Sequence, residues 1–149
     1  MRLWPTYAFL WMVGGCAATG PAVAVQGSDN DVSVVAGKWE GSYEGLESGR
    51  HGTISFDLFA GYRIAEGKVM MNAGGDPSQV KPLQIQFVQV GGKQLTGKIE
   101  PYTDPQCSCA VLTEFVGEVH GNTIGGTFTT HPVGSPKSQS GRWSANRTQ

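Results

Sequence analysis

Short runs of alternating apolar and polar residues recur along the chain from residue 33 onward. In the first run Trp39 and Tyr43 fall on one side of the chain, and Glu40 and Glu44 fall on the other. A period of two residues is typical of a β-strand with one buried face. The alternation therefore predicts eight strands, which cover approximately residues 37–44, 53–58, 62–71, 83–88, 94–100, 111–120, 123–130 and 140–146.

Turn signals separate these runs and predict hairpins. Gly91-Gly92 and Gly121-Asn122 are pairs whose residues accept positive φ, as tight hairpin turns require. Three longer loops are expected, at residues 71–81, 101–108 and 131–139. Strands joined mainly by hairpins form an antiparallel meander, and eight strands suffice to close such a sheet. We therefore predict an all-β fold: an eight-stranded up-and-down barrel in a single domain over residues 33–149.

The two ends of this domain carry a hint that the sheet closes. Trp39 in the first predicted strand follows Gly-Lys, and Trp143 in the last follows Gly-Arg. If the first and last strands are neighbours, the two indole rings stand inward side by side. The inward faces of the strands also carry most of the aromatic residues: Trp39, Tyr43, Phe56, Phe87, Phe115, Phe128 and Trp143. These side chains either fill a barrel of this size or line a cavity for one small apolar ligand, and both alternatives stay open.

Composition narrows the class of protein. The chain has 22 glycines among 149 residues, and only 15% of its residues are charged. Frequent glycine with few charges agrees with short strands and turns rather than long helices. The formal net charge is −1 and no run of lysine or arginine occurs, so nucleic acid is not an expected partner.

An apolar segment precedes the predicted domain. It carries one positive charge, Arg2, then runs from Leu3 to Val13 and ends in Val13-Gly14-Gly15-Cys16. This pattern resembles the signal peptide and lipobox of bacterial lipoproteins, although Val13 and Gly14 replace the commoner Leu and Ala or Ser. The resemblance implies removal of residues 1–15 and attachment of a lipid to the thiol of Cys16. A plain signal peptide cut near residues 17–24, which would give a secreted protein, is the alternative.

The lipobox resemblance also implies a location. Residue 17 is alanine rather than aspartate, which in lipoprotein sorting directs a protein to the outer membrane, here facing the periplasm. A diacylated and N-acylated cysteine carries enough acyl chains for stable membrane anchoring. Residues 16–32 are small or polar, and we expect them to form a flexible tether between anchor and barrel.

The predicted barrel resembles the calycins, the group of lipocalins, fatty-acid-binding proteins and avidins. The likeness rests on Gly-x-Trp at Trp39, on the meander, and on Arg147 just after the last strand. It implies that Arg147 packs over Trp39 at a closed end of the barrel, with Arg142 as a possible substitute. The polar residues that avidins use to hold biotin have no counterparts here, so biotin binding is not implied.

Cys107-Ser108-Cys109 is the sharpest local motif in the domain. If Cys16 is acylated, these are the two thiols that remain, and nearby thiols in an oxidising compartment usually form a disulfide. A soft-metal site with His120 or His131 is less favoured, because zinc sites usually combine two well-spaced ligand pairs. Free or redox-active thiols are a third alternative.

No catalytic motif accompanies these features. Serine, histidine and aspartate occur, but without a nucleophile elbow, and the glycine pairs lack the strand-to-helix setting of a phosphate loop. We expect no catalytic residue, cofactor or metal, and an enzyme is the less favoured class. The favoured function is a non-catalytic module that binds a small apolar ligand or lipid. The alternatives are a structural lipoprotein that docks an envelope protein through its three loops, and a thiol or metal site at Cys107 and Cys109.

Overall fold

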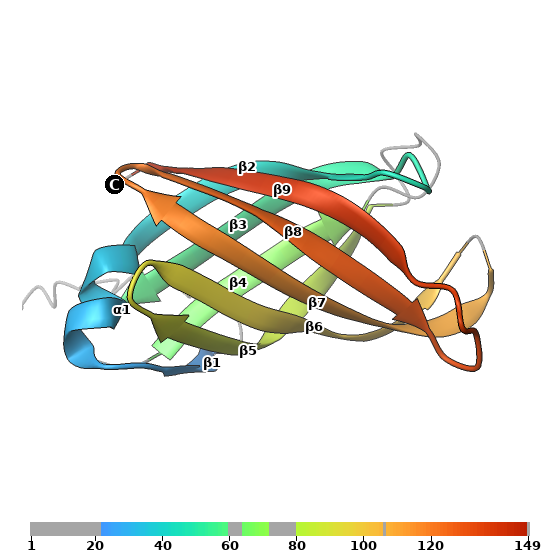
Figure 1. Cartoon of the computed structure of the whole chain (residues 1–149), viewed down its shortest axis with the longest axis horizontal. Helices are drawn as coiled ribbons and strands as arrows, with labels where there is room; N and C mark the ends of the chain where they lie inside the picture. Colours follow the sequence, from blue (N-terminus) through green and yellow to red (C-terminus); the bar gives the residue numbers. More distant parts are fainter. Residues whose placement is uncertain (1–21, 60–63, 72–79, 106, 149) are drawn as a thin grey trace, which may run out of the picture.

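The described residues form nine strands and one short helix (Figure 1). The computed structural model describes residues 22–59, 64–71, 80–105 and 107–148. The elements in chain order are β1 (Ala22–Gln26), α1 (Asp29–Val35), β2 (Gly37–Gly45), β3 (His51–Phe59), β4 (Ile64–Met71), β5 (Lys81–Gly91), β6 (Gln94–Asp104), β7 (Cys109–His120), β8 (Thr123–Pro132) and β9 (Gln139–Arg147).

Strands β2 to β9 form one antiparallel meander that closes on itself. Each strand pairs with the next, and β9 returns to pair with β2. In the closing pair Tyr43 lies opposite Trp143, and both side chains face the interior. The prediction of an all-β closed barrel is therefore confirmed. Each described strand of the barrel has a neighbouring strand on both sides, which removes a common route to aggregation.

The predicted count of eight strands is one too low. The ninth strand, β1, inserts where β4 and β5 separate: it is antiparallel to β4, with Val23 opposite Ala65, and parallel to β5, with Val25 opposite Val88. Toward the other end of the barrel β4 and β5 pair directly. Alanine alternates with valine in β1, so this strand lacks the alternating polar residues from which the other eight strands were predicted.

The prediction of a flexible tether over residues 16–32 is wrong for residues 22–32. Besides β1, this segment contains the first turn of α1, where the side chain of Ser28 accepts a hydrogen bond from the backbone N–H of Asp31. Val32 and Val35 are buried, and α1 lies across one end of the barrel (Figure 1). A run of small residues indicates a solvated tether, but here these residues pair with strands that are distant in the sequence. Residues 16–21 lie outside the described part of the chain.

The end covered by α1 is closed by a tryptophan and an arginine. The last carbonyl groups of a helix lack partners within the helix. Here the indole N–H of Trp39 donates to the carbonyl of Val35 at 2.9 Å, and Arg147 donates to the carbonyls of Val34, at 2.8 Å, and Ala36. The guanidinium of Arg147 also lies 4.4 Å from the centroid of the Trp39 ring. Helix, tryptophan and arginine thus form one plug, which we call the closed end.

Two glycines allow a large side chain to pack against the barrel wall. Trp143 is 5% exposed, and its indole N–H donates to the carbonyl of Val116 at 3.0 Å. A Cβ atom added to Gly117 would overlap the Trp143 ring, and one added to Gly126 would overlap the Val116 carbonyl. The missing side chains are therefore what lets the ring pack closely against β7 and β8.

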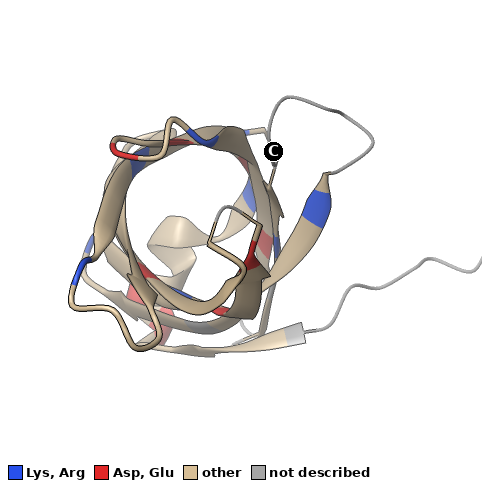
Figure 2. Cartoon of the chain, turned by 90° about the vertical axis from the view of Figure 1, so that its right-hand side faces the viewer, with Lys and Arg blue, Asp and Glu red and all other residues tan. Residues whose placement is uncertain are grey.

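The opposite end of the barrel carries the longer connections. Antiparallel order places the ends of β2, β4, β6 and β8 together with the starts of β3, β5, β7 and β9. The chain passes from β4 to β5, from β6 to β7 and from β8 to β9 here, beside the turn between β2 and β3. The loops expected at residues 101–108 and 131–139 are shorter than predicted, because β6 extends to Asp104 and β8 to Pro132. We call this the loop end; Figure 2 looks into the barrel from it, with α1 on the far side. Within the described residues, no helix is long and apolar enough to cross a membrane.

Candidate ligand-binding cavity

The interior of the barrel is hollow but narrow. It encloses a cavity of about 70 Å³, measured as the space that the centres of water molecules can occupy. One water molecule needs roughly 10–15 Å³ of such space, so the cavity could hold several waters or a slender molecule. Side chains from all nine strands line it. The barrel is therefore neither filled solid nor wide enough for a bulky ligand.

Apolar side chains form most of the lining. Among the described residues the aliphatic members are Val23, Ile54, Leu58, Ala65, Val69, Met71, Leu83, Ile85, Val88, Leu95 and Ile99. An apolar wall cannot satisfy the hydrogen bonds of water, so an apolar ligand that displaces water here gains the free energy of the hydrophobic effect.

Five of the seven aromatic residues expected to line the interior do so: Tyr43, Phe56, Phe115, Phe128 and Trp143. Four of them pack in edge-to-face pairs, Tyr43 on Phe128 and Phe115 on Trp143, with ring centroids 5.9 and 5.8 Å apart. Trp39 is 1% exposed and belongs to the closed end rather than to the cavity lining. The side chain of Phe87 lies outside the described residues.

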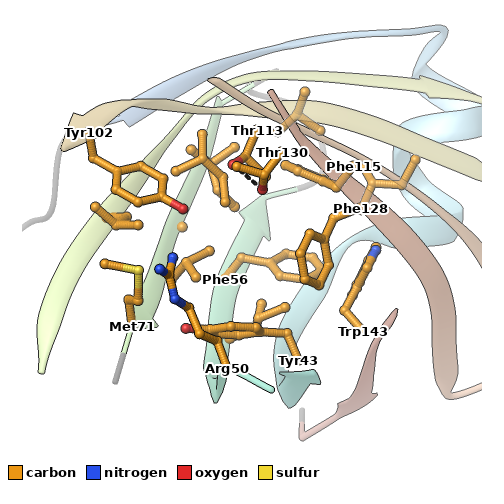
Figure 3. A pocket seen from close by; sticks show the side chains of 18 of the residues that line it. Tyr43, Arg50, Phe56, Met71, Tyr102, Thr113, Phe115, Phe128, Thr130 and Trp143 are labelled. Atoms are coloured by element: carbon orange, nitrogen blue, oxygen red, sulfur yellow. Dashed lines mark hydrogen bonds between the residues drawn. The ribbon is translucent and has the colours of Figure 1, made fainter. Parts of the chain in front are cut away.

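Polar residues gather where the cavity meets the loop end (Figure 3). Arg50, Tyr102, Thr113 and Thr130 line the cavity, and Asp104 lies behind Arg50; we call these five residues the loop-end cluster. Thr113 and Thr130 are opposite each other on β7 and β8, and their buried hydroxyl groups form a hydrogen bond of 2.8 Å. None of the five was singled out from the sequence.

A buried ion pair anchors the loop-end cluster. Both terminal nitrogens of Arg50 donate to the carboxylate of Asp104, one of them at 2.5 Å. The side chains are 9% and 3% exposed. These hydrogen bonds raise the pKa of Arg50 above its already high ordinary value, so its guanidinium stays charged. The pair joins the start of β3 to the end of β6 and balances one buried charge with another.

Arg50 and Tyr102 each bring a hydrogen-bond donor to the loop-end cluster. The Nε atom of Arg50 is buried and has no hydrogen-bond partner among the described residues. The guanidinium points toward the hydroxyl group of Tyr102 (Figure 3). Burial raises the pKa of Tyr102 above its ordinary value of 10.0, although Thr113 and the charge of Arg50 oppose part of this rise. Tyr102 is therefore a neutral phenol at neutral pH and can donate its proton in a hydrogen bond.

A surface carboxylate holds the turn between β2 and β3 against β9. Glu47 accepts hydrogen bonds from the backbone N–H and the hydroxyl group of Ser140, at 2.7 and 2.8 Å. The backbone N–H of Leu46 donates to the carbonyl of Ser140 at 2.9 Å. The bond from the Ser140 N–H is the main reason that the pKa of Glu47 falls below its ordinary value.

This contact predicts a local pH dependence. Because the pKa of Glu47 is lower in the folded chain, its contribution is present above the ordinary value of 4.5 and is lost as the pH falls through the folded pKa. In an NMR titration the amide proton of Ser140 should shift with a midpoint below 4.5, and the shift should be absent in Glu47→Gln. A wild-type midpoint at or above 4.5 would contradict the contact.

Cys107 and Cys109 form a disulfide at the loop end, with their Cα atoms 5.1 Å apart. Ser108 between them has a φ of 51°, in the left-handed region that non-glycine residues seldom adopt. This conformation turns the chain back so that two cysteines separated by one residue can meet. A bonded pair cannot offer two thiolates to a soft metal ion.

One of the two histidines suggested as metal ligands lies far from the cysteines. His120 ends β7, the twelve-residue strand that Cys109 begins, so it lies at the opposite end of the barrel. His131 is at the loop end, on β8 opposite Leu112. Among the described residues, no group of three histidine, cysteine, aspartate or glutamate side chains is placed to hold a metal ion.

The remaining predicted residues divide between the two ends. Arg147, rather than its possible substitute Arg142, covers Trp39; Arg142 lies on the exposed face of β9. The three loops suggested for docking connect strands at the loop end, although residues 72–79 and 106 lie outside the described part. Cys16 lies outside it as well. Docking of an envelope partner therefore stays a prediction.

Comparison with known proteins adds no relative. No protein-family model and no curated protein sequence matches this chain, so membership of the calycins stays a prediction that rests on the residues quoted for it.

Proposed function

We propose that this chain is a non-catalytic binding module that holds a small, slender and mainly apolar molecule inside its barrel. The observation that supports this proposal most directly is the cavity itself, which has apolar walls from all nine strands and a polar group at one end only. Each Å² of apolar surface that a ligand buries contributes about 25 cal/mol. A cavity that side chains fail to fill is costly to fold, so its retention is best explained by a ligand.

The two ends of the barrel differ in a way that suits this function. At the closed end α1 covers the interior, held by Trp39 and Arg147. At the loop end the polar cluster lies between the cavity and solvent. A ligand would therefore enter from the loop end, place its apolar part toward the closed end, and leave its polar group beside Arg50 and Tyr102.

We further propose that the module is anchored to the cell envelope by a lipid on Cys16, at the outer membrane and facing the periplasm. Because β1 begins at Ala22, only residues 17–21 would separate the lipidated cysteine from the barrel. A fully extended chain of that length reaches about 20 Å. The barrel would then work close to the membrane surface, where apolar molecules partition.

The test measures the binding of octanol to the purified domain by native mass spectrometry and by tryptophan fluorescence. Val69→Phe places a larger side chain in the cavity, whereas Val116→Phe makes the same change on the outer surface, where Val116 is 41% exposed. Binding should weaken at least about tenfold in Val69→Phe and stay unchanged in Val116→Phe. Equal binding by both variants, with both folded by circular dichroism, would show that the site is not in the barrel.

A further inference from the structure

The charge of Arg50 is already compensated inside the protein. Arg50 is the one charged residue among the described residues that line the cavity. Both of its terminal nitrogens are engaged by Asp104, and the two side chains are 9% and 3% exposed. The loop end of the cavity thus presents hydrogen-bond donors without presenting a net positive charge.

We propose that the loop-end cluster receives an uncharged hydrogen-bond acceptor, so that the ligand is a neutral amphiphile with a hydroxyl, carbonyl or ester oxygen rather than a carboxylate. This inference rests on the proposed function and adds the chemical class of the ligand. It assigns Arg50 and Tyr102 as the groups that select the polar end.

Two groups of the loop-end cluster favour an acceptor oxygen, the Nε–H of Arg50 and the hydroxyl group of Tyr102. The Nε–H of Arg50 is buried without a hydrogen-bond partner among the residues described, and such a donor is costly unless something pairs with it. The hydroxyl group of Tyr102 faces the same guanidinium (Figure 3). An oxygen atom of a ligand at this end of the cavity would accept from the hydroxyl group of Tyr102, with Arg50 beside it, while the Thr113–Thr130 pair continues the polar wall.

A carboxylate is disfavoured by the same geometry. It would bring a second negative charge to a guanidinium whose terminal nitrogens already bind Asp104. No lysine, histidine or second arginine lines the described part of the cavity to balance that charge. Moving an uncompensated anion from water into an apolar interior is strongly unfavourable. A neutral oxygen carries no such penalty.

The first experiment compares ligands with equal alkyl chains on the wild-type domain at pH 8. Octanol and methyl octanoate should each bind at least about tenfold more tightly than octanoate, by isothermal titration calorimetry and native mass spectrometry. Octanoate binding as tightly as octanol would overturn this inference while leaving the proposed function intact. No binding by any of the three would remove the proposed function and this inference with it.

The second experiment tests whether the preference for octanol over octanoate changes when the charge of Arg50 is no longer compensated. Asp104→Asn keeps the size of the side chain but leaves the charge of Arg50 uncompensated, so affinity for octanoate should rise relative to octanol by about tenfold or more. The matched control is Glu114→Gln, which makes the same chemical change in an exposed pair with Lys98 on the outer face and should leave the ratio unchanged. An unchanged ratio in folded Asp104→Asn would overturn the inference. If that variant does not fold, the wild-type comparison decides.

Discussion

Replacing Asp104 by leucine is expected to lower the free energy of unfolding by about 3–5 kcal/mol. The substitution leaves the guanidinium of Arg50 buried and charged with nothing to balance it, since the side chain is 9% exposed. It also removes the contact between residues 50 and 104, which are 54 positions apart and join β3 to the end of β6. Urea unfolding followed by fluorescence measures the loss.

The double variant Arg50→Met/Asp104→Leu separates the charge from the packing. Because it removes both charges, it should recover most of the stability that the single variant loses, and a non-additive double-mutant cycle should result. Glu114→Leu is the exposed control, because it breaks the ion pair between Glu114 and Lys98. The side chains of Lys98 and Glu114 are 59% and 55% exposed, so this variant should lose no more than about 1 kcal/mol of the free energy of unfolding. If Asp104→Leu loses as little free energy of unfolding as Glu114→Leu, the charge of Arg50 is solvated and the prediction is wrong.

Gly117→Ala is expected to lower the free energy of unfolding by about 3 kcal/mol. The new Cβ would overlap the six-membered ring of Trp143, which cannot simply move away because its N–H is bonded to the Val116 carbonyl. Gly125→Ala is the matched control, since a Cβ there meets open space, and it should be neutral or slightly stabilising. Thermal and urea unfolding of the two variants provide the comparison.

A second substitution tests whether overlap with the Trp143 ring is what destabilises Gly117→Ala. Phenylalanine lacks the ring atoms of Trp143 that the new methyl group would strike, so Trp143→Phe should cost less in the Gly117→Ala background than in the wild type. Equal costs in both backgrounds would mean that Gly117 is needed for its backbone rather than for the space it leaves. The near-ultraviolet circular dichroism of the tryptophans reports whether the ring has moved.

The strands were predictable because the signal for them is local. Alternation places Trp39 and Trp143 inward within their own segments, whatever the rest of the chain does, and the structure buries both. The barrel was predicted from the number of strands and their short turns, but only the two Gly-x-Trp segments hinted that the sheet closes, and full closure comes from the pairing of β2 with β9. The one missed strand, β1, lacks polar alternation, and its burial depends on the gap between β4 and β5.

The candidate site was only partly predictable. The sequence placed Tyr43, Phe56, Phe115 and Phe128 on inward faces, but whether such side chains fill a barrel depends on how volumes add across strands. Arg50 and Asp104 each sit beside a polar turn, where a charged residue is normally solvated. Nothing in either segment indicates that the other lies next to it.

The sequence by itself thus determined which faces of the strands are buried, the all-β meander and the aromatic interior, because each follows from residue patterns within short segments. The tertiary structure decided the ninth strand, the narrow cavity and the neutralised arginine at its loop end. These depend on contacts between residues far apart in the chain, such as the 54 positions between Arg50 and Asp104, and no local pattern encodes their distance.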